Sequence, residues 1–166
     1  GIKMCQAYRK QYGFNAISLM PTNLYGPGDN YHPENSHVMA AMIRRFYEAN
    51  QNNQETVTCW GDGTPRREFL YSDDLATACI LAMREYDDYE IMNVSTGEEV
   101  SISETAETVS KVVGYTGDIL WDTTKPNGTI KRPLHIKKIK ELGWNPEVSL
   151  EEGIGNSILD FKNKYS

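Results

Sequence analysis

Residues 20–45 read MPTNLYGPGDNYHPENSHVMAAMIRR, and the rest of the chain is organised around them. This segment begins where an apolar strand is expected to stop, and it finishes on an expected helix that carries two adjacent arginines. Between the two lies a loop dense in proline, glycine, asparagine and histidine. Such residues either fix the backbone or offer a short polar group, which is the composition of a binding loop. We therefore expect the functional centre of the molecule here.

The size, charge and cysteine content of the chain exclude several classes of protein. Its 166 residues are enough for one domain with a hydrophobic core. A net charge of −6 argues against a general partner of nucleic acid or of anionic membranes, because both need a basic face. No apolar run approaches the roughly 18 residues of a membrane span. Cys5, Cys59 and Cys79 have no disulfide or metal spacing, which predicts a reduced, cytoplasmic setting.

The spacing of apolar residues predicts alternating helices and strands. Helices are expected at residues 2–12, 36–49, 74–86, 101–113, 134–142 and 149–165, and short strands at 16–20, 57–60, 67–71, 91–94 and 119–121. The expected helix caps are Ser72 or Asp73, the capping box of Ser101 with Glu104, and that of Ser149 with Glu152. This alternation predicts an α/β fold. Because no linker divides the chain, we expect one compact unit over residues 1–166.

Two loop motifs are tested first for metal and phosphate binding. His32 and His37 lie near Asp29 and Glu34, but their spacing matches no zinc pattern, so we favour solvated loop residues and predict no metal site. The glycine pair in residues 61–63 lacks a third glycine and no helix obviously follows it. We expect a hairpin-like turn there rather than a phosphate cradle. The sequence contains no nucleotide-binding fingerprint.

Basic residues occur as pairs beside loops, namely Arg44-Arg45, Arg66-Arg67 and Lys131-Arg132. Three such pairs could converge on a polyanion, because arginine offers two donors to phosphate oxygens. Composition alone favours solvated surface, or pairing with the surplus carboxylates, for any single pair. Trp60 precedes the glycine turn, where core packing is the commoner role. An exposed tryptophan near Arg67 would instead be suited to stack on a base or sugar.

Four motifs together resemble those of the GDP-L-fucose synthase family within the extended short-chain dehydrogenase/reductases. They are the loop of residues 20–38 with the following Arg-Arg, WGDGTPRREFLYSDDLA at 60–76, NVSTG at 93–97 and KPNGT at 125–129. The motif of Gly61, Gly63, Arg67 and Phe69 is shared widely among nucleotide-sugar enzymes, whereas N-x-H-P-x-x-S-H-V is narrower. The resemblance implies the last strands of an NADP-binding Rossmann domain followed by a substrate-binding domain. It also implies epimerisation and reduction of GDP-4-keto-6-deoxymannose.

The resemblance assigns cofactor-side roles residue by residue. The family segment that lines the nicotinamide end of NADP(H) is matched by Pro21, Thr22, Asn23 and Leu24. His37 matches a histidine that lies near the cofactor and acts as general acid in epimerisation. A histidine suits this role because it can deliver a proton near neutral pH. His32, beside Pro33, is expected to be structural.

Contacts with the GDP-sugar are implied at a second set of positions. The matching residues are Arg45, Trp60, Arg67 and Asn127, with Arg67 expected on the diphosphate. The family usually has aspartate where this chain has Asn127, so one charge is lost there. Lys125 is a further candidate in the same loop.

The family also uses a glycine-rich loop, a catalytic cysteine and serine, and a Tyr-x-x-x-Lys pair. The 166 residues contain neither the glycine-rich loop nor Tyr-x-x-x-Lys, and they open on Gly-Ile-Lys rather than Met. We therefore expect a partial chain that is inactive alone and is completed by a Rossmann half. The family forms dimers through helices near the Tyr-x-x-x-Lys pair, so residues 1–12 predict a homodimer. An open edge on strand 16–20 favours self-association too.

Rival interpretations remain within and outside this family. Another nucleotide-sugar epimerase or dehydratase of the superfamily would share Arg67 and the Asp73-Asp74 region, but not the histidine loop. A non-catalytic nucleotide-sugar-binding module or one half of a split enzyme would also carry these motifs. An incomplete gene product or a stable proteolytic core would account for the missing half.

Overall fold

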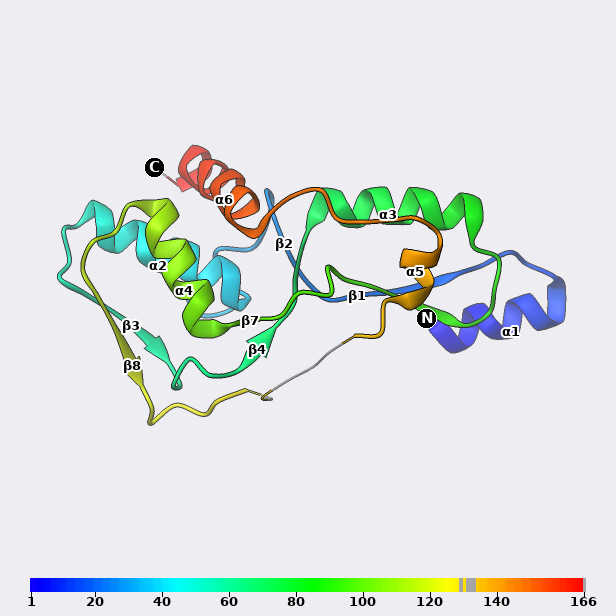
Figure 1. Ribbon diagram of the computed structural model, residues 1–166, viewed down its shortest axis with the longest axis horizontal. Coiled ribbons are helices and arrows are strands. Elements are labelled where there is room, and N and C mark those ends of the chain that lie inside the picture. The colour runs from blue at the N-terminus through cyan, green and yellow to red at the C-terminus, as the bar shows by residue number, and fades with distance from the viewer. Residues whose placement is uncertain (129, 131–133, 166) are drawn as a thin grey trace.

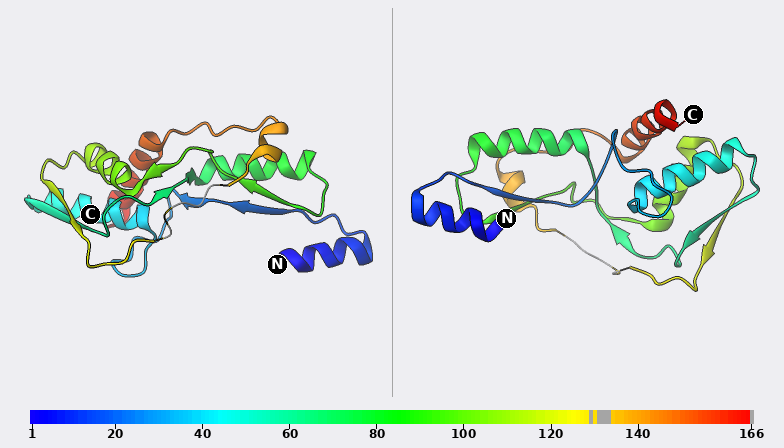
Figure 2. Two further views of the ribbon diagram at one scale, coloured as in Figure 1. Left: turned by 60° about the horizontal axis from the view of Figure 1, so that its bottom comes forward. Right: turned by 180° about the vertical axis from the view of Figure 1, so that it is seen from behind.

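The computed structural model describes residues 1–128, 130 and 134–165. Figures 1 and 2 show an elongated molecule in which α2, α4 and α6 gather at one end, and α1 and α3 lie on opposite sides of β1 at the other. The helices are α1 (Ile2–Tyr12), α2 (Val38–Gln51), α3 (Ser72–Glu85), α4 (Ile102–Val113), α5 (Lys137–Glu141) and α6 (Leu150–Tyr165). The strands are β1 (Ser18–Pro21), β2 (Asn23–Tyr25), β3 (Thr56–Trp60), β4 (Arg66–Arg67), β5 (Phe69–Tyr71), β6 (Ile91–Val94), β7 (Val100–Ser101) and β8 (Asp118–Asp122).

The strands pair two by two, mostly in parallel. β1 pairs in parallel with β6, β2 with β5 and β3 with β8, whereas β4 and β7 are antiparallel. Only Thr22 separates β1 from β2, and its N–H donates to the Val94 carbonyl at 3.0 Å. The ladder of β1 with β6 therefore runs on to the start of β2. Parallel strands joined through helices confirm the predicted α/β fold.

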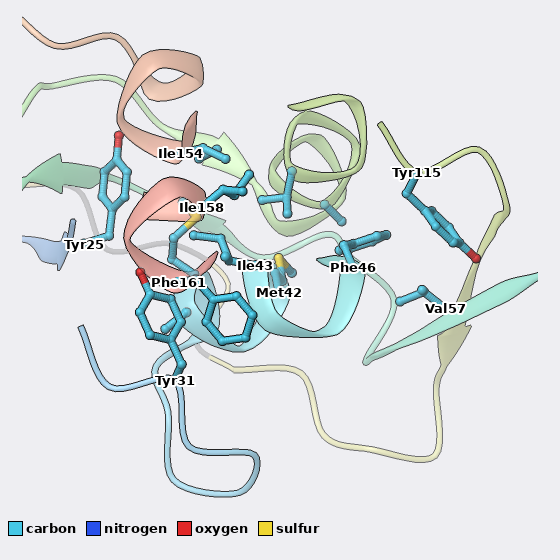
Figure 3. Close-up of a cluster of buried hydrophobic side chains, with 14 of the residues drawn as sticks. Tyr25, Tyr31, Met42, Ile43, Phe46, Val57, Tyr115, Ile154, Ile158 and Phe161 are labelled. Carbon is cyan, nitrogen blue, oxygen red and sulfur yellow. The ribbon is translucent and has the colours of Figure 1, made fainter. Parts of the chain in front are cut away.

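Apolar side chains form two separate clusters. The first, called the helical core, consists of Tyr25, Tyr31, Met39, Ala40, Met42, Ile43, Phe46, Ala49, Val57, Cys59, Phe69, Tyr71, Ala106, Val109, Tyr115, Ile154, Ile158 and Phe161. The second, called the sheet core, consists of Leu70, Ala78, Ala82, Met92, Val94, Ile136, Ile139 and Trp144. Figure 3 shows the side chains of α2 and α6 in the helical core pointing toward one another. Burying one such large side chain stabilises the fold by about 1.5–3 kcal/mol.

Local sequence signals account for the ends of several helices. Gly13 ends α1 in the left-handed conformation, with φ of 64°. The capping box at α4 is confirmed in both directions, since Ser101 Oγ accepts from Glu104 N–H and the Glu104 carboxylate accepts from Ser101 N–H. At α6 the Glu152 N–H donates to Ser149 Oγ at 3.3 Å. In the described part of the chain, no helix is both long and apolar enough to cross a membrane.

Two predictions about local structure were wrong, and two short strands were missed. Ser72 and Asp73 do not cap α3, because Tyr71 occupies the N-cap and makes no side-chain capping bond. The turn at residues 61–65 does not join a hairpin, because β3 and β4 pair with different strands, β8 and β7. The short strands β2 and β7 were not predicted, since two or three residues within polar segments carry no periodic signal.

Candidate functional site

The segment that follows β1 is fixed by an unpredicted residue, Glu68. Its backbone carbonyl accepts from Thr22 Oγ1 at 3.1 Å and from Asn23 Nδ2 at 2.9 Å. Its side chain is only 3% exposed and accepts from the Ser95 hydroxyl and from the Leu134 N–H. Glu68 therefore joins the end of β1 to the segments after β6 and before α5. The sequence signal for this role was a carboxylate directly before the apolar run of β5.

A cavity of about 330 Å³ lies between this segment and the start of α2. This cavity, called the loop pocket, is lined by Thr22, Asn23, Leu24, His37, Val38, Met39 and Phe69. His37 is the N-cap residue of α2, and its carbonyl accepts the Ala41 N–H at 2.9 Å. The structure therefore brings together three of the four predicted cofactor-side residues and the predicted general acid. Pro21 is the last residue of β1 and lies just outside this lining.

A second cavity, of about 280 Å³, also lies beside the N-terminal half of α2. This cavity, called the Trp60 pocket, is lined by Pro33, Glu34, Ser36, Val38, Ala41, Met42, Arg45, Cys59, Trp60 and Ile102. Two of the predicted substrate-binding residues, Arg45 and Trp60, thus share one cavity. Val38 lines both pockets, so the two cavities adjoin across this single side chain.

Arg45 lines the Trp60 pocket and is hydrogen-bonded to β3. Its Nη1 donates to the Thr58 carbonyl of β3 at 2.7 Å, which fixes the guanidinium beside the strand. Burial raises the pKa of the Cys59 thiol, and the adjacent Arg45 guanidinium opposes that rise. Cys59 is therefore a buried neutral thiol at neutral pH rather than a reactive thiolate.

Trp60 is the exposed member of this pocket. Its side chain is 66% exposed, so the interpretation of Trp60 as a core residue was wrong. Lys125 Nζ lies 5.7 Å from the centroid of the indole ring. The β3 strand explains the exposure, because its burial alternates and Trp60 is in the outward register with Thr56 and Thr58.

The predicted contacts at Arg67 and Asn127 lie on the turn and loop beyond Trp60. Asn127 Oδ1 accepts from the Asp62 N–H at 3.1 Å, so this side chain clamps its loop to the glycine turn. Arg67 is half-buried, and its Nη1 donates to the Arg66 carbonyl at 2.7 Å. A side chain at Gly128 would lie 2.8 Å from Arg67 Nη2, which places the loop against this arginine.

The other members of the basic pairs hold the fold rather than line the pockets described above. Arg44 donates to the Tyr31 carbonyl at 2.9 Å and pairs with Glu48 at 2.7 Å. Arg66 donates to the Glu99 carbonyl at 2.6 Å and lies 3.4 Å from the Glu104 carboxylate. The third pair, Lys131-Arg132, lies outside the described residues.

His32 differs from His37 in its surroundings. Its Nδ1 accepts the Glu34 N–H at 3.2 Å, and its own N–H donates to Asn30 Oδ1 at 3.0 Å. It therefore orders the loop that precedes α2 and lines neither the loop pocket nor the Trp60 pocket. Among the residues that the structure describes, no cluster of three or more histidine, cysteine or acidic side chains is placed to hold a metal ion.

Comparison with known proteins identifies the family. A family model described as the NAD dependent epimerase/dehydratase family matches residues 1–95, which is more than half of the chain. The chain belongs to this NAD dependent epimerase/dehydratase family. Within the family it is 54% identical to GDP-L-fucose synthase 1 of Arabidopsis thaliana over 157 residues, which cover 95% of this chain and 49% of that protein.

More distant relatives agree with this placement. GDP-L-fucose synthase of Escherichia coli strain K12 is 46% identical over 170 residues, covering 97% of this chain and 53% of the relative. A crystal structure of a GDP-L-fucose synthetase from Naegleria fowleri bound to NADP superimposes with a TM-score of 0.91 at 28% identity, covering 99% of this chain and 53% of that one. The resemblance found in the motifs is thereby confirmed. The chain spans about half the length of the curated relatives it matches.

Proposed function

We propose that this chain forms the substrate-binding side of a GDP-L-fucose synthase. The complete protein converts GDP-4-keto-6-deoxy-D-mannose to GDP-L-fucose by 3,5-epimerisation and NADPH-dependent reduction at C4. The observation that carries the proposal is the pair of adjoining pockets. His37 and residues 22–24 line one pocket, Arg45 and Trp60 line the other, and Val38 lines both. A ligand that crosses Val38 would meet both sets.

The two pockets suit the two ends of this chemistry. The loop pocket fits a nicotinamide end, because Leu24, Val38 and Phe69 give it apolar walls and Glu68 fixes its polar side chains. NADP(H), when bound, supplies the hydride for reduction. Arg45 and Arg67 bind the GDP-sugar in this proposal, and Arg67 takes the diphosphate because a guanidinium matches phosphate oxygens.

His37 is the group of this chain that we assign to proton transfer. The keto group of the substrate makes the hydrogens at C3 and C5 acidic, and epimerisation requires a proton to return to each carbon from the opposite face. His37 lies at the start of α2, lines the loop pocket and directly precedes Val38, which both pockets share, so its imidazole can hold that proton beside the sugar. The 166 residues contain no Tyr-x-x-x-Lys pair. We therefore infer that the chain alone does not turn over substrate.

The test joins this chain to the N-terminal half of its Arabidopsis relative. The fusion is expected to oxidise NADPH in the presence of GDP-4-keto-6-deoxymannose, and the 166-residue chain alone is expected to show no oxidation. In the fusion, His37→Gln should lower kcat by about 10²–10⁴-fold, which is typical for loss of a general acid. His32→Gln is the matched control and should retain activity. A fully active His37→Gln enzyme would contradict the assigned role.

A non-catalytic GDP-sugar-binding module is the second candidate, because the sequence lacks Tyr-x-x-x-Lys. Calorimetry with GDP and GDP-fucose separates the two candidates. Binding by this chain without turnover in the fusion favours the module, whereas turnover in the fusion favours the enzyme half. We retain residues 1–166 as one unit, the end of a Rossmann domain joined to a substrate-binding domain. The free cysteines Cys5, Cys59 and Cys79 favour a cytoplasmic setting for it.

We also propose that α1 lies at a subunit interface of a homodimer. α1 buries no residue of its own, and the apolar side chains exposed on it and just after it are Met4, Tyr8, Tyr12 and Phe14. Tyr8 contacts both Tyr12 and Phe14, with ring centroids 5.3 and 6.4 Å apart, so these rings form one patch. Sedimentation of Tyr8→Ser should show weaker self-association than wild type. Leu159→Ser, an equally exposed site on α6, is the matched control.

A further inference from the structure

Lys125 sits over the exposed tryptophan at the mouth of the Trp60 pocket. Its Nζ lies 5.7 Å from the centroid of the Trp60 ring. A cation at this distance from an indole face is attracted to it, although at an exposed site the contact is worth only about 0.5–1 kcal/mol. The contact therefore keeps the ammonium near the pocket but is too weak to fix its orientation.

The turn after β8 positions Lys125 beside Trp60. Asp122, the last residue of β8, lies opposite Trp60 in the parallel register. Its carboxylate accepts from the Thr124 N–H at 3.0 Å and from the Thr124 hydroxyl, and its carbonyl accepts the Lys125 N–H at 3.2 Å. The Asp122 carbonyl also accepts the Gly61 N–H at 3.0 Å. The chain thus turns back over the end of β3 immediately before Lys125.

The loop is anchored on the far side of Lys125 too. Asn127 Oδ1 lies so close to Gly61 that any side chain at residue 61 would collide with it. Gly61 has φ of 82°, which other residues rarely adopt, so the turn and the loop are adapted to each other. Lys125 therefore lies between two anchored residues. Asp122 is three residues before it, and Asn127 is two residues after it.

Within the described part of the chain Lys125 forms no direct ion pair; the pKa of the Asp122 carboxyl group is lowered mainly by hydrogen bonds from Thr124, and the charge of Lys125 adds to this. In the same described part, Arg44, Arg66, Lys111 and Lys138 form ion pairs with carboxylates, whereas Lys125 forms none. The chain carries 23 acidic and 17 basic residues, so most cations have carboxylates available. An ammonium that lies against an aromatic ring at the mouth of a pocket is placed to meet an anionic ligand.

We propose that Lys125 is a phosphate-binding residue of the nucleotide-sugar site, an inference that rests on the proposed function. A ring of the ligand lies against Trp60, and the diphosphate accepts a hydrogen bond from Lys125 Nζ beside that ring. Lys125 thus adds a third cation to Arg45 and Arg67. No covalent step is involved.

The test compares ligands that differ only in phosphate, bound by the 166-residue chain in calorimetry. The Lys125→Gln variant should bind GDP about threefold to tenfold more weakly than wild type, the scale of one exposed charge-assisted hydrogen bond. It should bind guanosine within about twofold of wild type, because guanosine has no phosphate. The affinity of wild type for GDP should also fall more steeply with salt than that of Lys125→Gln.

Lys162→Gln is the matched control. Lys162 Nζ lies 5.4 Å from the ring centroid of Tyr47, so it makes the same kind of contact but lines neither pocket. It should leave the affinities for GDP and guanosine unchanged. Both substituted lysines are exposed, and thermal unfolding of both variants should match wild type.

The outcomes separate the inference from the proposed function. Equal GDP affinity in wild type and Lys125→Gln overturns the inference alone. An equal loss for GDP and guanosine also overturns it, because the effect would then come from stacking or folding. Failure of wild type to bind GDP at millimolar concentration overturns the proposed nucleotide site and the inference with it.

Discussion

The helical core and the sheet core differ in how completely their elements are covered. In the helical core, α2 buries six residues and α6 buries five, and aromatic side chains fill the gaps between them. In the sheet core, α3 covers β1 and β6 from one side, while α1 on the other side buries no residue. Exposed apolar side chains accordingly gather on α1 and α3, where Tyr8, Ile80 and Met83 are examples.

Because the two cores differ in this way, the two pockets of the site should respond differently to mutation. The Trp60 pocket is built on the helical core, through Met42, Cys59 and the helix that carries Arg45. The loop pocket also touches this core through Met39 and Phe69, but its remaining walls include Thr22, Asn23 and Leu24 of the segment that joins the two cores. Nucleotide binding should therefore follow the stability of the helical core, whereas the geometry around His37 should depend on the junction between the cores.

The largest expected effect comes from breaking the helical core. Phe46 has no exposed surface and lies edge-on to Tyr115, with ring centroids 5.6 Å apart (Figure 3). Phe46→Ala should lower the free energy of unfolding by about 3–5 kcal/mol, because it removes a large side chain and leaves a cavity. Urea unfolding measures this loss. Met4→Ala on the uncovered α1 is the control and should change stability by about 0.5 kcal/mol or less.

Equal losses from Phe46→Ala and Met4→Ala would contradict the comparison. That result would mean that α1 is as well packed as α2, contrary to their burial in the structure.

The next largest effect is expected at the junction of the two cores. Glu68→Ala leaves the Ser95 hydroxyl and the Leu134 N–H without their acceptor in a buried place. We expect a loss of about 2–3 kcal/mol in the free energy of unfolding, the scale of a buried bond to a charged group. Exposed Glu107→Ala serves as control. Glu68→Gln, which keeps one acceptor oxygen, should lose less; a loss as large as that of alanine would show that the bonds do not depend on acceptor chemistry.

The two cores also differ in what the sequence predicted. The helices of the helical core follow from apolar spacing and caps, as the confirmed box of Ser101 and Glu104 shows. Strand pairing did not follow, because the pairing of β3 with β8 is set by helices packed between distant segments rather than by the turn after Trp60. Glu68 was missed for the same reason, since its partners lie 27 and 66 residues away.

Most of the candidate site was predicted from the family motifs rather than from the chemical character or spacing of individual residues. The motifs placed His37 with Thr22, Asn23 and Leu24, and the structure gathers these side chains around one cavity. Core packing was taken as the commoner role for Trp60, although a five-residue strand that alternates in burial exposes every second residue. Which face is exposed depends on packing of the helices, which the strand alone does not encode.

The smallest expected effect concerns the loop that links β8 to the Trp60 pocket. The pKa of Asp62 is lowered by hydrogen bonds from the Thr64 hydroxyl and N–H, and by the Asn127 amide. A lowered pKa stabilises the fold at pH above the unfolded value of 3.8, and this contribution is lost as pH falls through the folded pKa below that value. Asn127→Asp replaces a donor by a second carboxylate, so it should destabilise the chain slightly at pH 7.

The pH dependence identifies the cause of that small loss. Protonation of either carboxyl group as the pH falls removes the repulsion between them, so the difference between Asn127→Asp and wild type should be smaller at pH 3 than at pH 7. Asn127→Ala is the control, because it removes the amide without adding charge and its deficit should contain no repulsion. Thermal unfolding at pH 7 and pH 3 measures both variants. A deficit of Asn127→Asp that is the same at the two pH values would place its origin in the lost amide donor to the Asp62 carboxylate, which Asn127→Ala removes equally well.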